Sequence, residues 1–414
     1  MLNQPDPAIT LDDTRPGITD VPGFEAAGVA ADIRGKNDQR LDLALIVSRQ
    51  PCTAAGVFTT NDVKAPPVRV CQARLDAQPQ LHGIVANSGN ANACTGEQGQ
   101  RDAVNMAQEA ARACGLPDDS FLVCSTGRIG VALPMERLLQ GIHAAAPALG
   151  NTSDQGVAAA RAIMTSDTRP KHVTARFTWE GQTITVGGIA KGAGMIEPNM
   201  ATMLAFIATD IGASRTSLQQ QLARAVRGSF NAITVDGDMS TNDTVLVLAN
   251  HASGLTLPED PGAPLALLFQ EALRAVCAAL AEKIVGDGEK ITKVVALVVK
   301  GAPDEAAAEK VARAIGNSLL VKSSWYGNDP NWGRLADAAG YARIGLVESK
   351  LNLYYDDVPV LLAGTPCWDK RDAWKAIVSR KHFSITLDLQ LGSGAFRLLA
   401  SDLSEAYVNF NKSE

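Results

Sequence analysis

The chain has 414 residues, of which 46% are hydrophobic and 20% are charged, which is the composition of an ordinary globular protein with a large core. A net charge of −6 without a long basic run argues against nucleic acid as a partner. The seven cysteines and five histidines are dispersed without metal-binding spacing, so we expect reduced thiols, a cytoplasmic location and no metal site. No apolar run reaches the ~18 residues of a membrane span, so we expect no membrane partner.

The first part of the chain alternates short apolar runs with amphipathic stretches, as a mixed α/β protein does. Residues 1–22 are polar, and we expect a flexible leader there. Strands are predicted at 23–33, 41–47, 63–70, 84–86, 121–124, 173–179 and 183–186, and helices at 98–114, 135–146 and 156–164.

Two polar turns follow two of these strands. Asn87 to Gly96 is rich in Asn, Ser and Gly, and it either lines a polar site or forms an elaborate turn. The turn from Ser125 to Gly130 either presents backbone N–H groups to an anion or oxyanion, or is a strand-to-helix turn with a threonine cap.

The stretch from Lys191 to Asp210 changes character halfway along. Residues 191–199 carry glycines, a proline and two charges, as an irregular loop does, whereas 203–209 indicates a buried strand or the start of a helix. Thr202 lies at the boundary. By residue type it is a helix N-cap; the alternative is a hydroxyl held rigidly where a loop enters the core, which suits a nucleophile.

The last part of the chain continues the α/β pattern. Helices are predicted at 214–227, 264–284, 304–318 and 372–380, and strands at 294–299, 351–355 and 383–391. Two further strands within 231–250 flank a loop that contains Asp236, Asp238 and Asp243. We interpret this loop as a hydrogen-bonded structural loop, because its glycine is misplaced for a calcium loop and no glutamate closes it.

The segment Lys191-Gly-Ala-Gly-Met-Ile-Glu-Pro-Asn-Met-Ala-Thr-Met-Leu closely resembles the self-cleavage segment of the ornithine acetyltransferase family, also called glutamate N-acetyltransferases. Asn87–Gly96, the loop around Asp236 and Asp329-Pro-Asn-Trp-Gly-Arg also resemble motifs of that family, and the resemblance runs from about Gly23 to Asn411. It implies a four-layer αββα sandwich with mixed sheets, of the kind shared with self-processing amidases. It also implies cleavage between Ala201 and Thr202 into an α chain, 23–201, and a β chain, 202–414, which associate as two α and two β chains.

The resemblance also implies the site residues. Thr202 is the nucleophile, and its new α-amine, with a pKa of roughly 8, is the base. Thr126 and Gly127 form the oxyanion hole. The substrate is bound by Thr165, Lys191, Thr202, Glu289 and Asn411. The chain departs from the family pattern where Lys290-Ile291 replaces Gly-Ala, and at the C-terminus, where Ser413 could supply the last hydroxyl only with a shifted backbone.

The expected activity is therefore transfer of an acetyl group from N2-acetylornithine to glutamate through an acetyl-Thr202 intermediate, without a cofactor. The sequence leaves acetyl-CoA open as a second donor. Three alternatives also stay open: an N-terminal-threonine amidohydrolase, an acetyltransferase of the same family that acts on another amino acid, and a non-catalytic ligand-binding relative.

Overall fold

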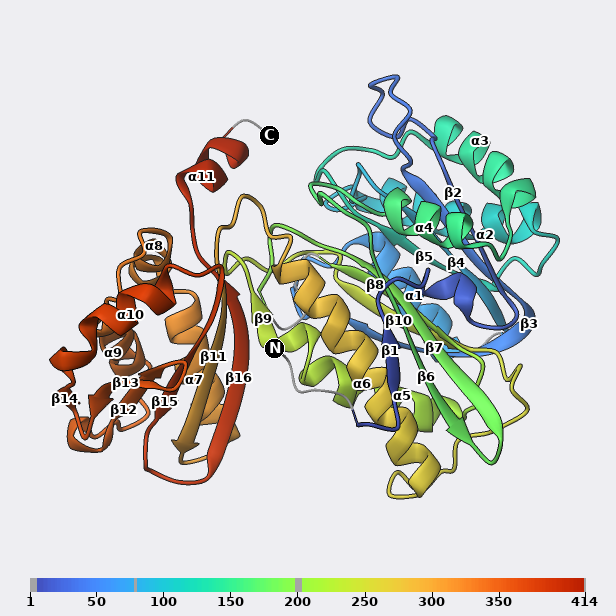
Figure 1. Cartoon of the computed structure of the whole chain (residues 1–414). Helices are drawn as coiled ribbons and strands as arrows, with labels where there is room; N and C mark the ends of the chain where they lie inside the picture. The colour runs from blue at the N-terminus through green and yellow to red at the C-terminus, as the bar shows by residue number, and fades with distance from the viewer. Residues whose placement is uncertain (1–5, 78–79, 198–202, 413–414) are drawn as a thin grey trace.

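The computed structural model describes residues 6–77, 80–197 and 203–412. These residues form a 9-stranded and a 7-stranded β-sheet, with helices packed on their faces (Figure 1). Both sheets mix parallel and antiparallel pairs, since β8 and β10 run parallel in the first sheet, as do β11 and β15 in the second. The predicted mixed α/β class is confirmed.

The 9-stranded sheet is bent along one long strand. Its strands, in sheet order, are β1 (Thr10–Asp12), β6 (Lys171–Trp179), β7 (Gln182–Lys191), β8 (Leu204–Thr209), β10 (Thr244–Ala249), β3 (Leu43–Phe58), β4 (Leu81–Asn87) and β5 (Phe121–Ser125), and β2 (Phe24–Val29) pairs with β3. The end of β3 pairs with β10, whereas its beginning pairs with β2 and β4. The pairing register of β3 with β4 shifts between Val47 and Cys52. Strand β3 therefore belongs to two half-sheets.

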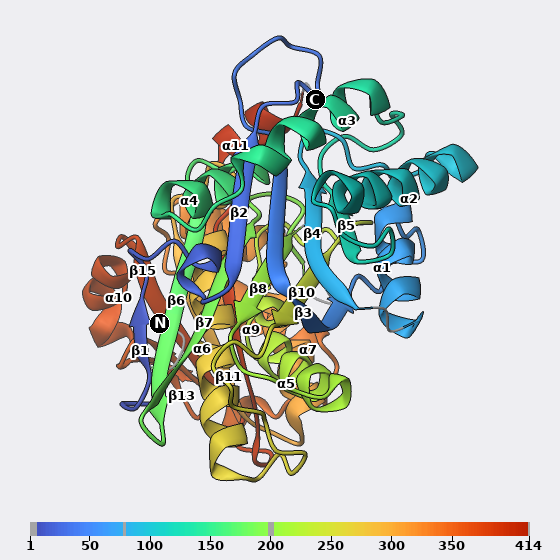
Figure 2. The ribbon, with the colours of Figure 1, turned by 90° about the vertical axis from the view of Figure 1, so that its right-hand side faces the viewer.

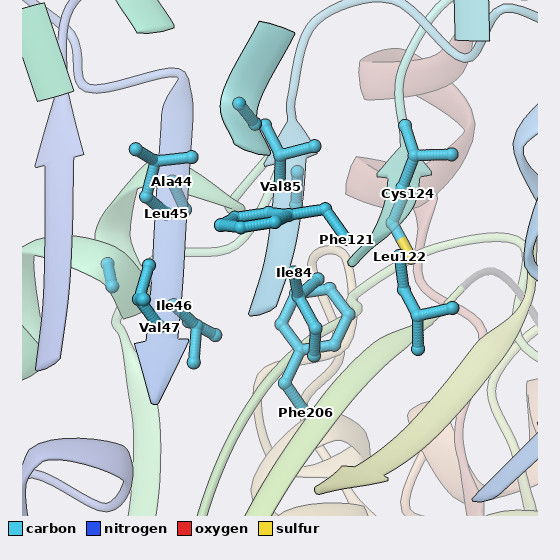
Figure 3. Packing of buried hydrophobic residues seen from close by; sticks show 14 of the residues in the cluster. Ala44, Leu45, Ile46, Val47, Ile84, Val85, Phe121, Leu122, Cys124 and Phe206 are labelled. Atoms are coloured by element: carbon cyan, nitrogen blue, oxygen red, sulfur yellow. The ribbon is translucent and has the colours of Figure 1, made fainter. Parts of the chain in front are cut away.

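The two half-sheets pack face to face. Successive side chains of a strand point to opposite faces, and in β8 Phe206 belongs to the same buried cluster as Ile84 of β4 and Phe121 of β5 (Figure 3). The next residue, Ile207, belongs to a second cluster that it shares with the helices behind β8. The strand that follows the proposed cleavage position is therefore buried on both faces, as the apolar run 203–209 indicated.

Helices cover the outer faces of this sandwich (Figure 2). Helix α2 (Gly96–Ala113) packs against β4 and β5 and touches both α1 (Pro66–Ala77) and α3 (Met135–Ala145), while α4 (Ser153–Ala162) lies against β2. On the opposite side α5 (Arg215–Arg227) packs on β3, and α6 (Pro264–Val285) packs on β6 and β7. The four-layer αββα sandwich with mixed sheets is confirmed.

The 7-stranded sheet adds a further layer beyond α6 (Figure 1). Its strands, in sheet order, are β14 (Thr365–Pro366), β13 (Val358–Leu362), β12 (Asn352–Tyr355), β15 (His382–Asp388), β11 (Val294–Ala302), β16 (Gly394–Ser401) and β9 (Ile233–Thr234). One face of this sheet meets α6, and the other packs on helices from the last third of the chain. The helices of this part are α7 (Glu305–Gly316), α8 (Leu319–Tyr326), α9 (Trp332–Tyr341) and α10 (Arg371–Val378). The 3-10 helices of the described chain are η1 (Ile18–Asp20), η2 (Ala146–Ala148), η3 (Phe230–Ala232), η4 (Glu348–Lys350) and η5 (Trp368–Lys370).

The structure differs from the sequence predictions in two segments. Residues 63–70 were expected to form a strand, but α1 begins at Pro66, because Pro66 and Pro67 suit the first turn of a helix, where no backbone N–H is needed. In the expected leader, 1–22, the described residues include β1, which pairs with β6, and the buried side chains of Ile18 and Val21. The described part of this segment is thus packed onto the sandwich.

Helix α6 is long and apolar enough to cross a membrane by length and composition alone. It lies between the two sheets, and 61% of its most apolar window is buried inside the protein. Its apolar character is thereby accounted for by packing on both of its sides.

The last described helix, α11 (Glu405–Asn411), has no buried residue. It follows β16 and extends away from the 7-stranded sheet (Figure 1). The hydroxyl of Ser404 caps the helix at Tyr407 N and donates a hydrogen bond to the Lys290 carbonyl over 2.6 Å. The hydroxyl of Tyr407 lies 3.2 Å from Asp236 Oδ2. Polar contacts to two loops therefore hold α11.

Candidate active site

The predicted site residues lie where several elements end. Thr126 and Gly127 follow β5, Thr165 follows α4, Lys191 ends β7, Glu289 lies in the turn after α6, and Asn411 ends α11. Ala201 and Thr202 lie outside the described residues, directly before Met203 and β8. Segments from across the sequence thus converge near the start of β8.

Lys191 joins two of the predicted positions directly. Its side chain is fully buried, and Nζ donates hydrogen bonds to Thr165 Oγ1 over 2.7 Å and to Thr126 Oγ1 over 3.3 Å. Burial lowers the pKa of the Lys191 ammonium, and the negative charge of Asp167 partly offsets that effect. Lys191 also pairs with Leu204 across the β7–β8 ladder, so this cation lies beside the strand that begins next to Thr202.

The turn after β5 is shaped to present donors. The Thr126 N–H donates to the Asn87 carbonyl over 3.0 Å. The donor that Thr126 can offer to a ligand is therefore its side-chain hydroxyl. Gly127 has φ of 133°, and a Cβ there would lie 2.3 Å from the Gly89 carbonyl carbon, so only glycine fits. Among the residues that the structure describes, the Gly127 N–H has no acceptor. A hydroxyl and a neighbouring free N–H can together stabilise an oxyanion.

The loop from Asn87 to Gly96 supports this turn. Its asparagine side chains are buried and bind backbone carbonyls: Asn87 Nδ2 donates to Asn90 O, Asn90 Nδ2 to Val131 O, and Asn92 Nδ2 to Gly99 O. Of the two readings of this loop, the structure therefore favours the elaborate turn. The turn acts on the site indirectly, because Gly89 and Asn90 pack against Gly127.

A buried ionic triad holds the turns that carry Thr165 and Glu289. Lys171 Nζ donates to Asp167 Oδ1 and to Asp287 Oδ2, each over 2.6 Å, and all three side chains are almost completely inaccessible. Asp167 also accepts the N–H groups of Thr165 and Gly192. Burial alone would raise the pKa of Asp167, but the Lys191 and Lys171 charges outweigh it and lower the pKa to about 2.

Sequence reasoning did not assign roles to Asp167, Lys171 and Asp287. Asp167 lies in the same short motif as Thr165, and Asp287 is two residues from Glu289, so proximity to predicted site residues was the available signal. The ion pair between Lys171 and Asp287 left no signal in the sequence, because the two residues are 116 positions apart.

Glu289 and Asn411 form the second part of the site. Asn411 Nδ2 donates to Glu289 Oε2 over 2.9 Å, and the Glu289 N–H donates to the Ala193 carbonyl over 2.9 Å. A Cβ on Gly194 would lie 2.4 Å from the Glu289 carboxyl carbon, so glycine lets that carboxylate lie against the loop. The loop after Lys191 thus connects the Lys191 cation to the Glu289 anion.

Lys290, which departs from the family pattern, adopts φ of 55°, a conformation that favours glycine. Its Nζ lies 4.9 Å from the centroid of the Phe410 ring, a cation–π contact with α11. Lys290, the residue that departs from the family pattern, therefore contacts α11.

Asp236 holds the loop that leads toward residue 201. Its carboxylate accepts the N–H groups of Met195 and Ile196, each over 2.7 Å, and the N–H of Asp238 over 3.3 Å. This is the hydrogen-bonded structural loop that the sequence indicated. Among the described residues no group of three or more His, Cys, Asp or Glu side chains is arranged to hold a metal ion.

Thr165 and Asp167 also border a cavity of about 420 Å³. The remaining lining residues are Arg40, Leu41, Arg161, Met164, Thr168 and Pro170. Arg40 donates to the carbonyls of Met164 and Thr165 over 2.6 and 2.5 Å, so it holds the backbone of the Thr165 turn. A volume of this size is within the range of small-molecule sites.

Comparisons with known proteins show which sequences this chain is similar to. A model of the ArgJ family matches residues 25–413. The "Arginine biosynthesis bifunctional protein ArgJ" of Symbiobacterium thermophilum is 46% identical over 397 residues, which cover 96% of this chain and 98% of that protein. The protein of the same name from Thermotoga neapolitana is 46% identical over 394 residues, which cover 94% of this chain and 98% of that protein.

Solved structures match part of the chain. The argJ protein of Bacillus halodurans is 38% identical and covers 47% of this chain and 99% of its own, with a TM-score of 0.43. The ornithine acetyltransferase of Mycobacterium tuberculosis, complexed with ornithine, is 40% identical and covers 46% of this chain and 98% of its own, with a TM-score of 0.42.

Proposed function

The chain belongs to the ArgJ family, and from this premise we propose that it is an acetyltransferase that moves the acetyl group of N2-acetylornithine to glutamate. The family membership confirms the resemblance found in the sequence and ties the protein to arginine biosynthesis. In this proposal the chain first cuts itself between Ala201 and Thr202, and Thr202 then becomes an N-terminal nucleophile whose α-amine is the general base.

The reaction has two halves. Thr202 attacks the acetyl carbonyl of N2-acetylornithine, the Thr126 hydroxyl and the Gly127 N–H donate to the oxyanion, and ornithine leaves. The α-amine of glutamate then attacks the acetyl-Thr202 ester and carries the acetyl group away. A covalent intermediate divides one difficult amide exchange into two easier steps.

The observation that carries this proposal is the double contact of Lys191 with Thr165 and Thr126 beside the start of β8. This contact brings Thr165, a predicted substrate-binding residue, and Thr126, a predicted oxyanion donor, beside the strand that follows Thr202 in the chain. The fixed Lys191 cation and the Glu289 carboxylate, with Asn411 on Glu289, offer opposite charges to a zwitterionic amino acid.

We further propose that the enzyme works in the cytoplasm as two α and two β chains and needs no cofactor. Acetyl-CoA is proposed as a second acetyl donor, because the relatives are named bifunctional. A thioester would acylate the same Thr202, so no additional nucleophile is required.

Intact mass spectrometry of the purified protein tests the proposal. We expect two fragments that meet at Ala201 and Thr202, an adduct of about 42 Da on the Thr202 fragment after addition of N2-acetylornithine, and loss of that adduct on addition of glutamate. Thr202→Ala should stay a single chain without an adduct. Thr209→Ala, a threonine at the far end of β8, is the matched control and should cleave normally.

Two results would count against the proposal. Cleavage of Thr202→Ala would remove Thr202 as the nucleophile. An adduct that water removes as fast as glutamate does would favour an N-terminal-threonine amidohydrolase on the same residues.

A further inference from the structure

A cavity of about 390 Å³ lies where α5, α6, α7 and β16 meet. The described residues that line it include four arginines, Arg224, Arg227, Arg274 and Arg397, and one acidic residue, Glu305. We call it the arginine cavity. None of the predicted site residues that the structure describes lines it. A protein with a net charge of −6 thus has a locally basic cavity, whose volume is within the range of small-molecule sites.

Three elements supply the four arginines. Arg224 and Arg227 lie in the last turn of α5, Arg274 lies in α6, and Arg397 lies in β16. Helix α5 packs on α6, and β16 contacts both α6 and η3 (Figure 1). Arg397 points toward α6, because it lies two residues before Leu399, which is buried in the same cluster as the apolar side chains of α6. Packing of elements that are distant in sequence therefore brings the four cations together.

Two of the four cations are balanced by carboxylates of the protein. Arg227 Nη2 lies 2.8 Å from Glu305 Oε1, in an ion pair whose side chains are both more than half-exposed. Arg274 Nε and Nη2 donate to the two carboxylate oxygens of Glu271 over 2.8 and 2.5 Å. Because each of these arginines has an acidic partner, neither indicates a ligand by itself.

Arg224 and Arg397 lack such a partner, since neither side chain makes a hydrogen bond or an ion pair with a residue in 6–77, 80–197 or 203–412. Arg224 is exposed in the last turn of α5, where the helix dipole favours a cation. That reason does not apply to Arg397, which is half-buried on a strand. Burial lowers the pKa of the Arg397 guanidinium, and the charge of Glu282 offsets this only in part. A partly desolvated cation without a partner is unfavourable, so Arg397 needs an explanation that packing does not give.

We propose that the arginine cavity is a binding site for a small phosphate-bearing anion, separate from the candidate active site. The planar guanidinium fork matches the oxygens of a phosphate group, which it binds with two parallel hydrogen bonds. Arg224 and Arg397 supply the two unoccupied forks from different elements, so an anion with more than one phosphate group can bridge them. The paired Arg227 and Arg274 keep the surrounding walls positive.

The cavity also has an aromatic side. The Phe396 ring lines it, and the guanidinium carbon of Arg313 lies 5.7 Å from the centroid of that ring. A planar base stacks on such a ring. The shared chemistry of the ligand is therefore a polyphosphate group, which is either free or part of a nucleotide.

Isothermal titration calorimetry of the purified full chain with pyrophosphate and with ADP tests the proposal. We expect saturable binding of pyrophosphate at one site per chain. Arg224→Met and Arg397→Met should each weaken that binding at least about tenfold, because each removes a charged hydrogen-bond donor to the anion. Tighter binding of ADP than of pyrophosphate, lost in Phe396→Leu, would identify a nucleotide; equal binding of the two would identify a free polyphosphate.

Arg371→Met is the matched control. Arg371 is an exposed arginine at the start of α10, makes no side-chain hydrogen bond or ion pair within the described part of the chain, and does not line the cavity. This variant changes the net charge by the same amount and should bind pyrophosphate as the wild type does.

Thermal unfolding gives a second measurement. Pyrophosphate should raise the unfolding temperature of the wild type and of Arg371→Met, but not that of Arg397→Met. Without ligand, Arg397→Met should unfold no earlier than the wild type, because an apolar side chain replaces a half-buried cation that has no partner.

Three results would overturn the proposal. They are the absence of saturable binding of both pyrophosphate and ADP, wild-type affinity in the double variant of Arg224→Met and Arg397→Met, and binding of citrate as tight as that of pyrophosphate. None of these measurements involves Thr202 or acetyl transfer, so failure here leaves the proposed function untouched.

Discussion

The ammonium group of Lys191 and the hydroxyl of Thr165 lie 2.7 Å apart, although 26 positions separate the two residues in sequence. This contact needs the turn after α4 and the end of β7 to be held in register. Asp167 provides that support, since it accepts the N–H groups of both Thr165 and Gly192 and is itself paired with Lys171. The geometry of the site thus depends on the buried ionic triad beneath it.

Lys171→Met should be strongly destabilising. The substitution leaves the Asp167 and Asp287 carboxylates buried without the cation that both contact, and removal of one partner of a buried ionic pair costs about 3 to 5 kcal/mol. Urea unfolding measures this change. Lys300→Met is the control, because Lys300 is half-exposed and 3.6 Å from Asp388, and should cost less than about 1 kcal/mol. Equal effects of the two variants would contradict the role given to the triad.

The triad should also make stability depend on acidic pH. The pKa of Asp167 is about 2 in the folded protein, against 3.8 for the ordinary group. A lowered carboxyl pKa contributes stability above the ordinary value that is lost as the pH falls through the folded value, here about 2 kcal/mol. The free energy of unfolding of Asp167→Asn should therefore lack this component of the decline between about pH 4 and pH 2. A variant with the same acid dependence as the wild type would contradict this assignment.

Glu289→Gln should weaken binding of the amino-acid substrate more than it slows self-cleavage. The amide keeps an oxygen for Asn411 Nδ2 but removes the negative charge that we propose to bind the substrate amine. We expect a rise in KM of roughly tenfold, which corresponds to about 1.4 kcal/mol, with complete self-cleavage. Glu405→Gln changes an exposed carboxylate on α11 and should leave KM unchanged. An unchanged KM in Glu289→Gln would remove Glu289 from the site.

Lys290→Gly should loosen α11 without changing overall stability much. Glycine relieves the positive-φ conformation of Lys290, by about 1 kcal/mol, but gives the unfolded chain a comparable gain in freedom. The contact with Phe410 is lost in the same change. Hydrogen exchange in residues 405–411 should therefore accelerate, while exchange in β8 stays as slow as in the wild type. Phe410→Leu removes the same contact from the other side and should have the same effect.

Local patterns in the sequence predicted much of the sandwich. Strands β6 and β7 were expected at 173–179 and 183–186, and the continuously apolar run 203–209 was expected to be a buried strand or the start of a helix, which the structure shows as the strand β8. The strand expected at 63–70 was wrong, because Val68 and Val70 suit a strand by type but follow a Pro-Pro pair that starts α1. The strand preference of the two valines was outweighed by the helical backbone angle that the two prolines impose.

The parts that were not predicted depend on contacts between distant residues. Strand β14 has only the residues Thr365–Pro366, and it is a strand because it pairs with Leu361 and Leu362 of β13. The pairing of strands in the layer beyond α6 could therefore not be derived from local periodicity, although several of its strands were predicted. In the site, the resemblance indicated Thr165 and Lys191 as separate residues, but their contact and the support by Lys171 and Asp287 needed the folded chain.

Strand β8 begins just after the proposed cut, yet it pairs with β7 from before the cut, and β10 pairs with β3 in the same way. Each fragment would thus contain strands that form hydrogen bonds with strands of the other fragment. Severing one peptide bond leaves this shared sheet intact, so the products would stay together as one body. Synthesis as a single chain then guarantees equal numbers of the two halves, a stoichiometry that separate genes would have to regulate.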